Sequence, residues 1–170
     1  MSNLKNNPAQ MSRQLFVDTF GGIYEHSSWV AETLWDQGLE DDCVKIETLA
    51  SAMAKIVSAA PYQAKLDLIN AHPDLAGKAA VRGELTDEST SEQANAGLNE
   101  CNAEEFEKFQ KYNDAYKEKF GFPFIKAVRN SNRHEILKGF EERLVNTDEV
   151  EFETALTEID KIAAFRLQDL

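Results

Sequence analysis

The sequence predicts an all-α fold: a single-domain helical bundle with irregular active-site segments between the helices. Apolar residues recur at intervals of three and four along most of the 170 residues, which is the period of an amphipathic helix. Helix-end signals accompany this pattern, among them the capping-box pair Asn102 and Glu105 and the stop at Gly121. No stretch shows the alternation that is typical of a strand, and no segment repeats another.

The N-terminus is expected to be a tail. Residues 1–10 are polar and rich in Asn, which predicts a flexible segment and leaves 11–170 as the helical domain. The first helix is expected over 11–20, where apolar residues cluster before the breaker pair Gly21–Gly22.

Three further helices are predicted before the middle of the chain. Ser27 or Ser28 can cap a helix that extends to Trp35, because a hydroxyl accepts from the first free amides. Apolar residues at near-helical spacing predict a longer helix over 41–59. Pro61 suits the first turn of the next helix, which ends before a His-Pro step.

The second half of the chain predicts four helices. A short one is expected over 91–98, closed near Gly97. The capping box and a strong apolar stripe predict a long helix over 102–120. A second capping-box spacing opens a helix over 132–144, and the last helix is expected over 147–167.

Composition excludes several classes of function. The net charge of -12 argues against a nucleic-acid partner, because binding to phosphates requires a basic surface. No apolar run reaches the length of a membrane span, so no membrane partner is expected. The widely spaced Cys43 and Cys101 fit free thiols in a reducing compartment, and a cytoplasmic location is predicted.

The polar interruption from Ala71 to Leu98 is the first candidate for chemistry. His72 precedes a proline, which disfavours helical backbone angles, and its side chain titrates near neutral pH. Such a histidine can act as a general acid or base, or simply as a cation beside the last carbonyls of a helix. Glu92 has a similar alternative, since Ser89 and Glu92 have capping-box spacing at a helix start that also suits an anion.

The second candidate is the turn after Pro123. Its composition favours core packing, yet backbone amides released from helical pairing need other acceptors, and a polar heterocycle would serve. Arg129 and Arg166 could each pair with a carboxylate, and the sequence does not decide between them. We predict no metal site, because His26 and His134 lack partners at ligand spacing.

Several long segments resemble one family. HPDLAGKAA (72–80), LTDESTSEQANAGL (85–98) and KFGFPFIKAVR (119–129) resemble signature segments of 2-oxo-4-hydroxy-4-carboxy-5-ureidoimidazoline (OHCU) decarboxylases. FGGIYEHSSWVAE and ALTEIDKIAAFRL are similar to the same family, so that the resemblance extends over most of the chain. One departure is Asn130–Ser131, where the family often has glycine.

The resemblance implies an enzyme. The implied reaction decarboxylates OHCU to (S)-allantoin and CO2, the last step from urate to allantoin in purine catabolism. It also implies an all-α homodimer that acts on this small molecule without cofactor or metal. The competing interpretation is a non-catalytic all-α interaction module that docks through its apolar 122–125 segment.

The resemblance also implies roles for particular residues. His72 is implied to be catalytic, and we assign Glu92 the hypothetical role of orienting the substrate through a hydrogen bond. The sequence leaves open whether His72 delivers the proton directly. The residues implied to bind substrate are Pro73, Ser89, Thr90, Ser91, Gln93, Phe124, Ile125, Lys126, Ala127, Val128 and Arg166.

Overall fold

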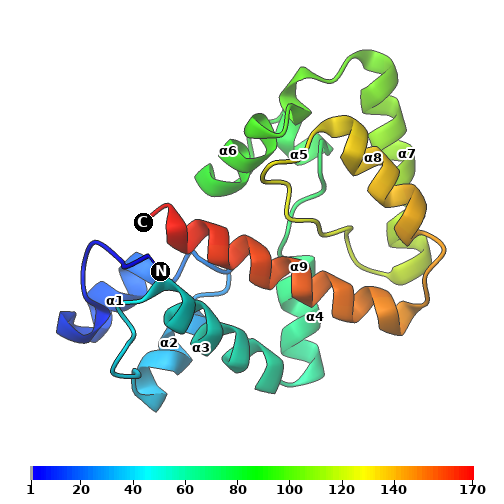
Figure 1. The fold of residues 1–170 in the computed structure, drawn as a ribbon. Coiled ribbons are helices and arrows are strands. Elements are labelled where there is room, and N and C mark those ends of the chain that lie inside the picture. The colour runs from blue at the N-terminus through cyan, green and yellow to red at the C-terminus, as the bar shows by residue number, and fades with distance from the viewer. Residues whose placement is uncertain (1) are drawn as a thin grey trace. The chain divides into compact units, whose positions relative to one another are not determined.

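The structure, a computed structural model, describes residues 2–170 and confirms the all-α class (Figure 1). Within these residues the β-type pairing recorded is an isolated antiparallel bridge between Asn3 and Lys45. The helical elements are η1 (Pro8–Gln10), α1 (Arg13–Phe20), α2 (Trp29–Gln37), α3 (Ile46–Ala59), α4 (Tyr62–Asn70), α5 (Lys78–Val81), α6 (Asp87–Asn95), η2 (Leu98–Glu100), α7 (Ala103–Phe120), α8 (Arg133–Arg143) and α9 (Asp148–Gln168).

These helices form two compact units. Unit 1 contains the chain up to Ala71 together with Ile159–Leu170, and unit 2 contains His72–Glu158. Helix α9 therefore contributes its first part to unit 2 and its second part to unit 1. Each unit has its own buried apolar residues, and the two are described separately.

Unit 1 is built around the contacts of α2 with α1 and α3. Phe16 is fully buried, with its ring centroid 4.8 Å from that of Phe20 and 5.3 Å from that of Trp35. Ser28 occupies the N-cap position of α2, but no hydrogen bond from its side chain caps the helix. Helix α3 begins at Ile46, so the prediction that it starts at residue 41 is wrong.

The N-terminal segment makes ordered contacts in unit 1. Leu4 is buried and its amide donates to the Val44 carbonyl at 2.8 Å, while the Ile46 amide donates to the Ser2 carbonyl at 3.1 Å. The Asn7 side chain caps η1. The flexibility of residues 1–10 in solution stays a prediction, which amide exchange at Leu4 would test.

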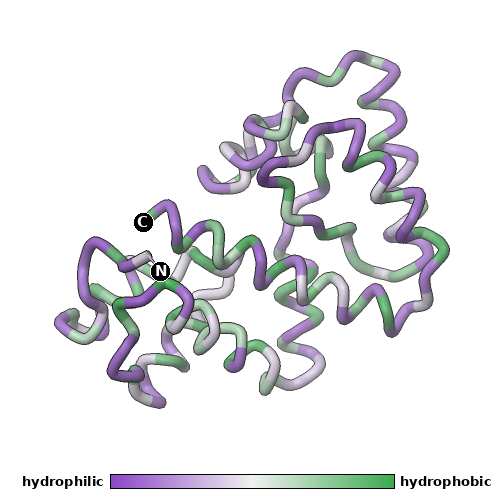
Figure 2. The backbone as a smooth tube through the Cα atoms, in the orientation of Figure 1, coloured by the Kyte–Doolittle hydropathy of each residue, from purple (hydrophilic) through white to green (hydrophobic). Residues whose placement is uncertain are grey.

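Unit 2 has an aromatic core between α7, α8 and the segment that joins them. Phe124 stacks on Phe140 with ring centroids 3.8 Å apart, and the Tyr116 ring meets Phe124 edge-on at 5.3 Å. Figure 2 shows hydrophobic residues along much of this connecting segment. The segment therefore belongs to the core even though it has no regular secondary structure.

The ends of α7 agree with the sequence. The Glu105 amide donates to Oδ1 of Asn102 at 2.8 Å, and the Asn102 amide donates to Oε1 of Glu105 at 3.2 Å, which completes the capping box. Gly121 ends the helix with φ 78°, a left-handed conformation that glycine adopts without steric cost.

Candidate functional site

His72 begins an irregular loop between α4 and α5. The His72 side chain is buried, with 8% of the residue exposed. The loop turns at Ala76, which has a left-handed φ of 50°, and Gly77 follows in an extended conformation at the N-cap of α5. A Cβ on Gly77 would lie 2.6 Å from the Cβ of Asp74, so the turn requires glycine here. We call residues 72–77 the histidine loop.

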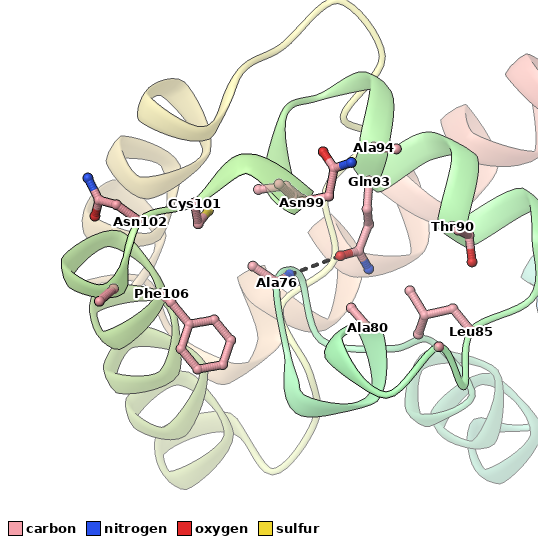
Figure 3. A pocket seen from close by; sticks show the side chains of 13 residues that line it. Ala76, Ala80, Leu85, Thr90, Gln93, Ala94, Asn99, Cys101, Asn102 and Phe106 are labelled. Atoms are coloured by element: carbon pink, nitrogen blue, oxygen red, sulfur yellow. Dashed lines mark hydrogen bonds between the residues drawn. The ribbon is translucent and has the colours of Figure 1, made fainter.

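Gln93 joins α6 to the histidine loop. Its Oε1 accepts from the Ala76 amide at 2.9 Å, and its Nε2 donates to the Asp74 carbonyl at 3.2 Å. Figure 3 shows the Gln93 side chain directed at the backbone of Ala76. Because Gln93 is buried, its amide replaces the water that these backbone groups would otherwise bind.

Helix α7 holds the same loop from another direction. Asn113 Nδ2 donates to the Leu75 carbonyl at 2.9 Å, and Gln110 Nε2 donates to the Ala76 carbonyl at 2.8 Å. Lys117 Nζ lies 2.6 Å from Oδ2 of Asp74, in an ion pair that is partly exposed. Three consecutive loop residues are thus tied to a single helix.

The block from Ser89 to Gln93 lies inside a helix and not at its start. Helix α6 begins at Asp87, because Thr86 Oγ1 accepts from the Ser89 amide at 3.2 Å and caps it. The predicted start at residue 91 and the capping-box role for Glu92 are therefore wrong. The block does not supply the free amides of a helix N-terminus, although Gly97, with φ 77°, follows its end as predicted.

Side chains of this block differ in exposure. Ser89 and Gln93 are buried, Glu92 is partly buried, and Thr90 and Ser91 are exposed. The buried pair faces the unit 2 interior at positions four apart, which is one helical turn. Binding of substrate by any of these five residues stays a prediction.

The segment from Phe124 to Val128 is buried at Phe124, Ile125 and Val128 and partly buried between them. The Ala127 amide donates to Oε1 of Glu158 at 3.4 Å, so this released amide has a protein acceptor. Asn130 adopts φ 62°, the left-handed conformation that asparagine tolerates best after glycine. The departure from the family's glycine therefore preserves the turn.

A buried ionic cluster supports this segment, and sequence reasoning missed it. Glu151 is fully buried and accepts from Arg143 Nε at 2.8 Å, from Tyr116 Oη at 2.5 Å and from Asn146 Nδ2 at 3.0 Å. Arg143 also donates to the Ile125 carbonyl, and its guanidinium lies 4.3 Å from the Phe124 ring centroid. Burial raises the pKa of Tyr116, and its hydrogen bond to Glu151 acts in the same direction.

Arg166 belongs to unit 1. Its Nη2 lies 2.7 Å from Oε2 of Glu25, and Nη1 lies 3.4 Å from the carbonyls of Gly22 and Ile23. Both members of the ion pair are buried. Arg166 thus braces the loop before α2, a role that the sequence did not indicate, and its contact with substrate stays a prediction.

Unit 2 also contains a pocket of about 550 Å³ between the histidine loop, α6 and the start of α7 (Figure 3). Thr90 and Gln93 are the predicted site residues that line it, whereas His72 and Glu92 do not. Most of the remaining lining is apolar, with Cys101 at the rim. Burial raises the pKa of the Cys101 thiol, which argues against an activated thiolate.

Over residues 2–170, no cluster of three or more His, Cys, Asp or Glu side chains is arranged to hold a metal ion. No described helix combines the length and apolar character needed to cross a membrane.

The fold and the histidine loop define the class: an all-α protein with a His-Pro-Asp-Leu loop in which His72 and Leu75 are buried. The chain belongs to the OHCU decarboxylase family, whose model matches residues 9–168. The matched residues include parts of both units.

Individual relatives agree with this assignment. The chain is 44% identical over 161 residues to the 2-oxo-4-hydroxy-4-carboxy-5-ureidoimidazoline decarboxylase of Halalkalicoccus jeotgali, covering 95% of this chain and 88% of that protein. It is 40% identical to the uric acid degradation bifunctional protein of Bacillus subtilis, over 95% of this chain and 31% of that one. A crystal structure of (S)-allantoin synthase superposes with a TM-score of 0.73 at 36% identity, over 95% of this chain and 52% of that chain.

Proposed function

We propose that the protein decarboxylates OHCU to (S)-allantoin and CO2 in urate degradation. Family membership supports this reaction, as do the names of relatives that act on OHCU or form (S)-allantoin. The observation on which the proposal rests is that Gln93 links the histidine loop to α6. Two motifs that are separate in the sequence are thereby joined at Asp74 and Ala76, in the loop that carries His72.

The chemistry requires no external electron acceptor. When the bond between ring carbon and carboxylate breaks, its electron pair stays on the ring, where adjacent C=N and C=O groups accept it. CO2 departs, the C=N nitrogen takes up one proton, and a proton adds to the neighbouring ring carbon that bears the ureido group as the hydroxyl group loses its proton and becomes a carbonyl. We assign this acid/base role to His72, because the unperturbed pKa of histidine is the one closest to neutral pH among the side chains.

Glu92 and the segment after Pro123 supply orientation in this proposal. Glu92 accepts a hydrogen bond from the ureido or hydroxyl group, which selects the face that receives the proton. Backbone groups of residues 124–128 bind the ring carbonyl and ureido oxygen. Ser89 and Gln93 complete the polar contacts, and a hydrogen bond from Arg166 to the substrate stays a prediction, since its charge is paired with that of Glu25.

The decisive experiment is a stereospecific assay on freshly generated OHCU. The wild-type protein should accelerate loss of the OHCU absorbance and yield a single allantoin enantiomer, whereas an interaction module would do neither. His72→Ala should lower turnover by about 10²- to 10⁴-fold, the usual contribution of a positioned acid/base group. Near-normal turnover by the folded variant would exclude the role of His72.

We further propose a cytoplasmic homodimer. Both cysteines are free thiols in the structure, which fits a reducing compartment. The dimer follows from the family resemblance, and sedimentation at several protein concentrations tests it.

A further inference from the structure

We infer that Asn113 is a positioning residue for the loop that carries His72. The inference rests on the proposed decarboxylase function, in which His72 must be held at a fixed place relative to the substrate. Asn113 lies on α7, and its side chain donates to the Leu75 carbonyl, a backbone group outside the predicted substrate-binding residues. Its effect on the reaction would therefore be transmitted through the backbone of the histidine loop.

The contacts of α7 single out this asparagine. Gln110, Asn113 and Lys117 follow each other at helical spacing, and each reaches a different residue of the loop. Gln110 and Lys117 are partly exposed, so water can replace their hydrogen bonds. Asn113 is 1% exposed, so the Leu75 carbonyl loses its donor without replacement if the amide is removed.

The buried amide is otherwise hard to explain. Within the part of the chain that the structure describes, Oδ1 of Asn113 has no hydrogen-bond partner. An unsatisfied buried oxygen costs stability, and an apolar side chain of the same size would avoid that cost. The hydrogen bond from Nδ2 of Asn113 to the Leu75 carbonyl offsets this cost.

The loop needs such support because its backbone is strained. Ala76 has φ 50°, a conformation that side-chain-bearing residues adopt only when their surroundings impose it. Helix α7 is a rigid frame for this purpose, since its capping box and Gly121 satisfy both ends. Asn113 acts at Leu75, the residue immediately before the strained turn.

Two variants remove the donor in different ways. Asn113→Asp places an acceptor against the Leu75 carbonyl, and Asn113→Leu replaces the amide with an apolar group of similar size. Both should lower kcat by about 10- to 100-fold, because a displacement near 1 Å is enough for such a loss. KM should change by less than about threefold, because no substrate contact is removed.

A pH profile separates positioning from general destabilisation. A buried carboxyl group titrates above its ordinary value, and its protonated form can again donate to Leu75. The kcat of Asn113→Asp relative to wild type should therefore rise about tenfold or more between pH 8 and pH 5. Asn113→Leu has no titratable group at this position, so its kcat relative to wild type should not change with pH.

Phe109→Leu is the matched control for stability. Phe109 lies on the same helix, is fully buried and packs edge-on against Phe140 of α8, so its replacement leaves the hydrogen bond from Asn113 to Leu75 in place. It should destabilise the protein while leaving kcat close to that of wild type. Equal kcat losses in Phe109→Leu and the Asn113 variants, or a flat profile for Asn113→Asp, would overturn the inference.

Amide exchange distinguishes failure of this inference from failure of the proposed function. Exchange of residues 74–77 should be about tenfold faster in both Asn113 variants and unchanged in Phe109→Leu, since the loop opens locally. If wild type does not decarboxylate OHCU, the proposed function fails, and faster exchange still supports the role of Asn113 in holding the loop. Unchanged exchange in both Asn113 variants overturns that role whatever the activity.

Discussion

Arg166 and Glu25 form a buried ion pair across 141 positions of sequence, with Nη2 2.7 Å from Oε2. Only 5% of Arg166 and 1% of Glu25 are exposed, so neither charge is screened by water. The next residue back along the loop, Tyr24, donates to Oδ1 of Asp160 at 2.8 Å. Two successive loop residues are thus attached to α9 by polar contacts.

Breaking this pair from either side should be costly. Glu25→Gln or Arg166→Met leaves one buried charge uncompensated, and each should lower the free energy of unfolding by about 3–5 kcal/mol. The double variant should lose less than the sum, because no lone charge remains. Urea unfolding of wild type, the two single variants and the double variant measures the coupling free energy between the two side chains. Strictly additive losses would show that Glu25 and Arg166 do not stabilise each other.

The same variants test the predicted contact of Arg166 with substrate. If Arg166 binds the substrate, the double variant should recover stability relative to Arg166→Met without recovering activity. Recovery of both would assign Arg166 a purely structural role.

Gly77→Ala should disturb the histidine loop. The new Cβ would lie 2.6 Å from the Cβ of Asp74, a contact that the neighbouring backbone must move to relieve. We expect a loss of about 1–3 kcal/mol in stability, as for other overpacked sites, together with reduced turnover. Thermal unfolding measures the stability, and the OHCU assay measures the turnover.

Gly139→Ala is the control for that substitution. Gly139 lies in α8, and its nearest contacts with an added Cβ are ordinary ones at 3.7 Å. Alanine there should stabilise the helix by about 0.5–1 kcal/mol. Similar destabilisation by both substitutions would contradict the steric explanation for Gly77.

Asp160 predicts a pH dependence of stability in unit 1. Burial raises the pKa of its carboxyl group, and the hydrogen bond from Tyr24 opposes this only in part. Because the pKa is raised in the folded state, protonated Asp160 contributes fully to stability below its unfolded pKa of about 4. This contribution is lost as the pH rises through the folded pKa. Asp160→Asn should therefore gain stability relative to wild type as the pH rises above the unfolded pKa of about 4.

Asp36 provides the opposite sign as a control. Its hydrogen bond with Arg13 lowers the pKa of its carboxyl group, so its contribution is lost as pH falls. Asp36→Asn should therefore be less stable than wild type at neutral pH, and this difference should disappear in acid. Asp160→Asn should be more stable than wild type at neutral pH, and that difference should also disappear in acid. Urea unfolding at several pH values follows both, and parallel trends in the two variants would rule out this assignment.

Local signals in the sequence determined the helical class and several helix ends. The capping box of Asn102 with Glu105 and the stop at Gly121 act within one helical turn, and the structure confirms both. A competing cap was harder to judge: Thr86 and Ser89 are both good N-caps, and the sequence favoured the wrong one. The long motifs identified the family, and the comparisons confirm it.

Tertiary structure decided which of these residues meet. Gln93 reaches Ala76 across 17 positions, and Tyr116 reaches Glu151 across 35, so no local pattern could pair them. The sequence therefore determined helices, their caps and a set of candidate residues, because those depend on neighbours a few positions away. Only the packed chain decided that Gln93 supports the histidine loop and that Arg166 is neutralised by Glu25, because buried polar groups must find whichever partner packing brings near.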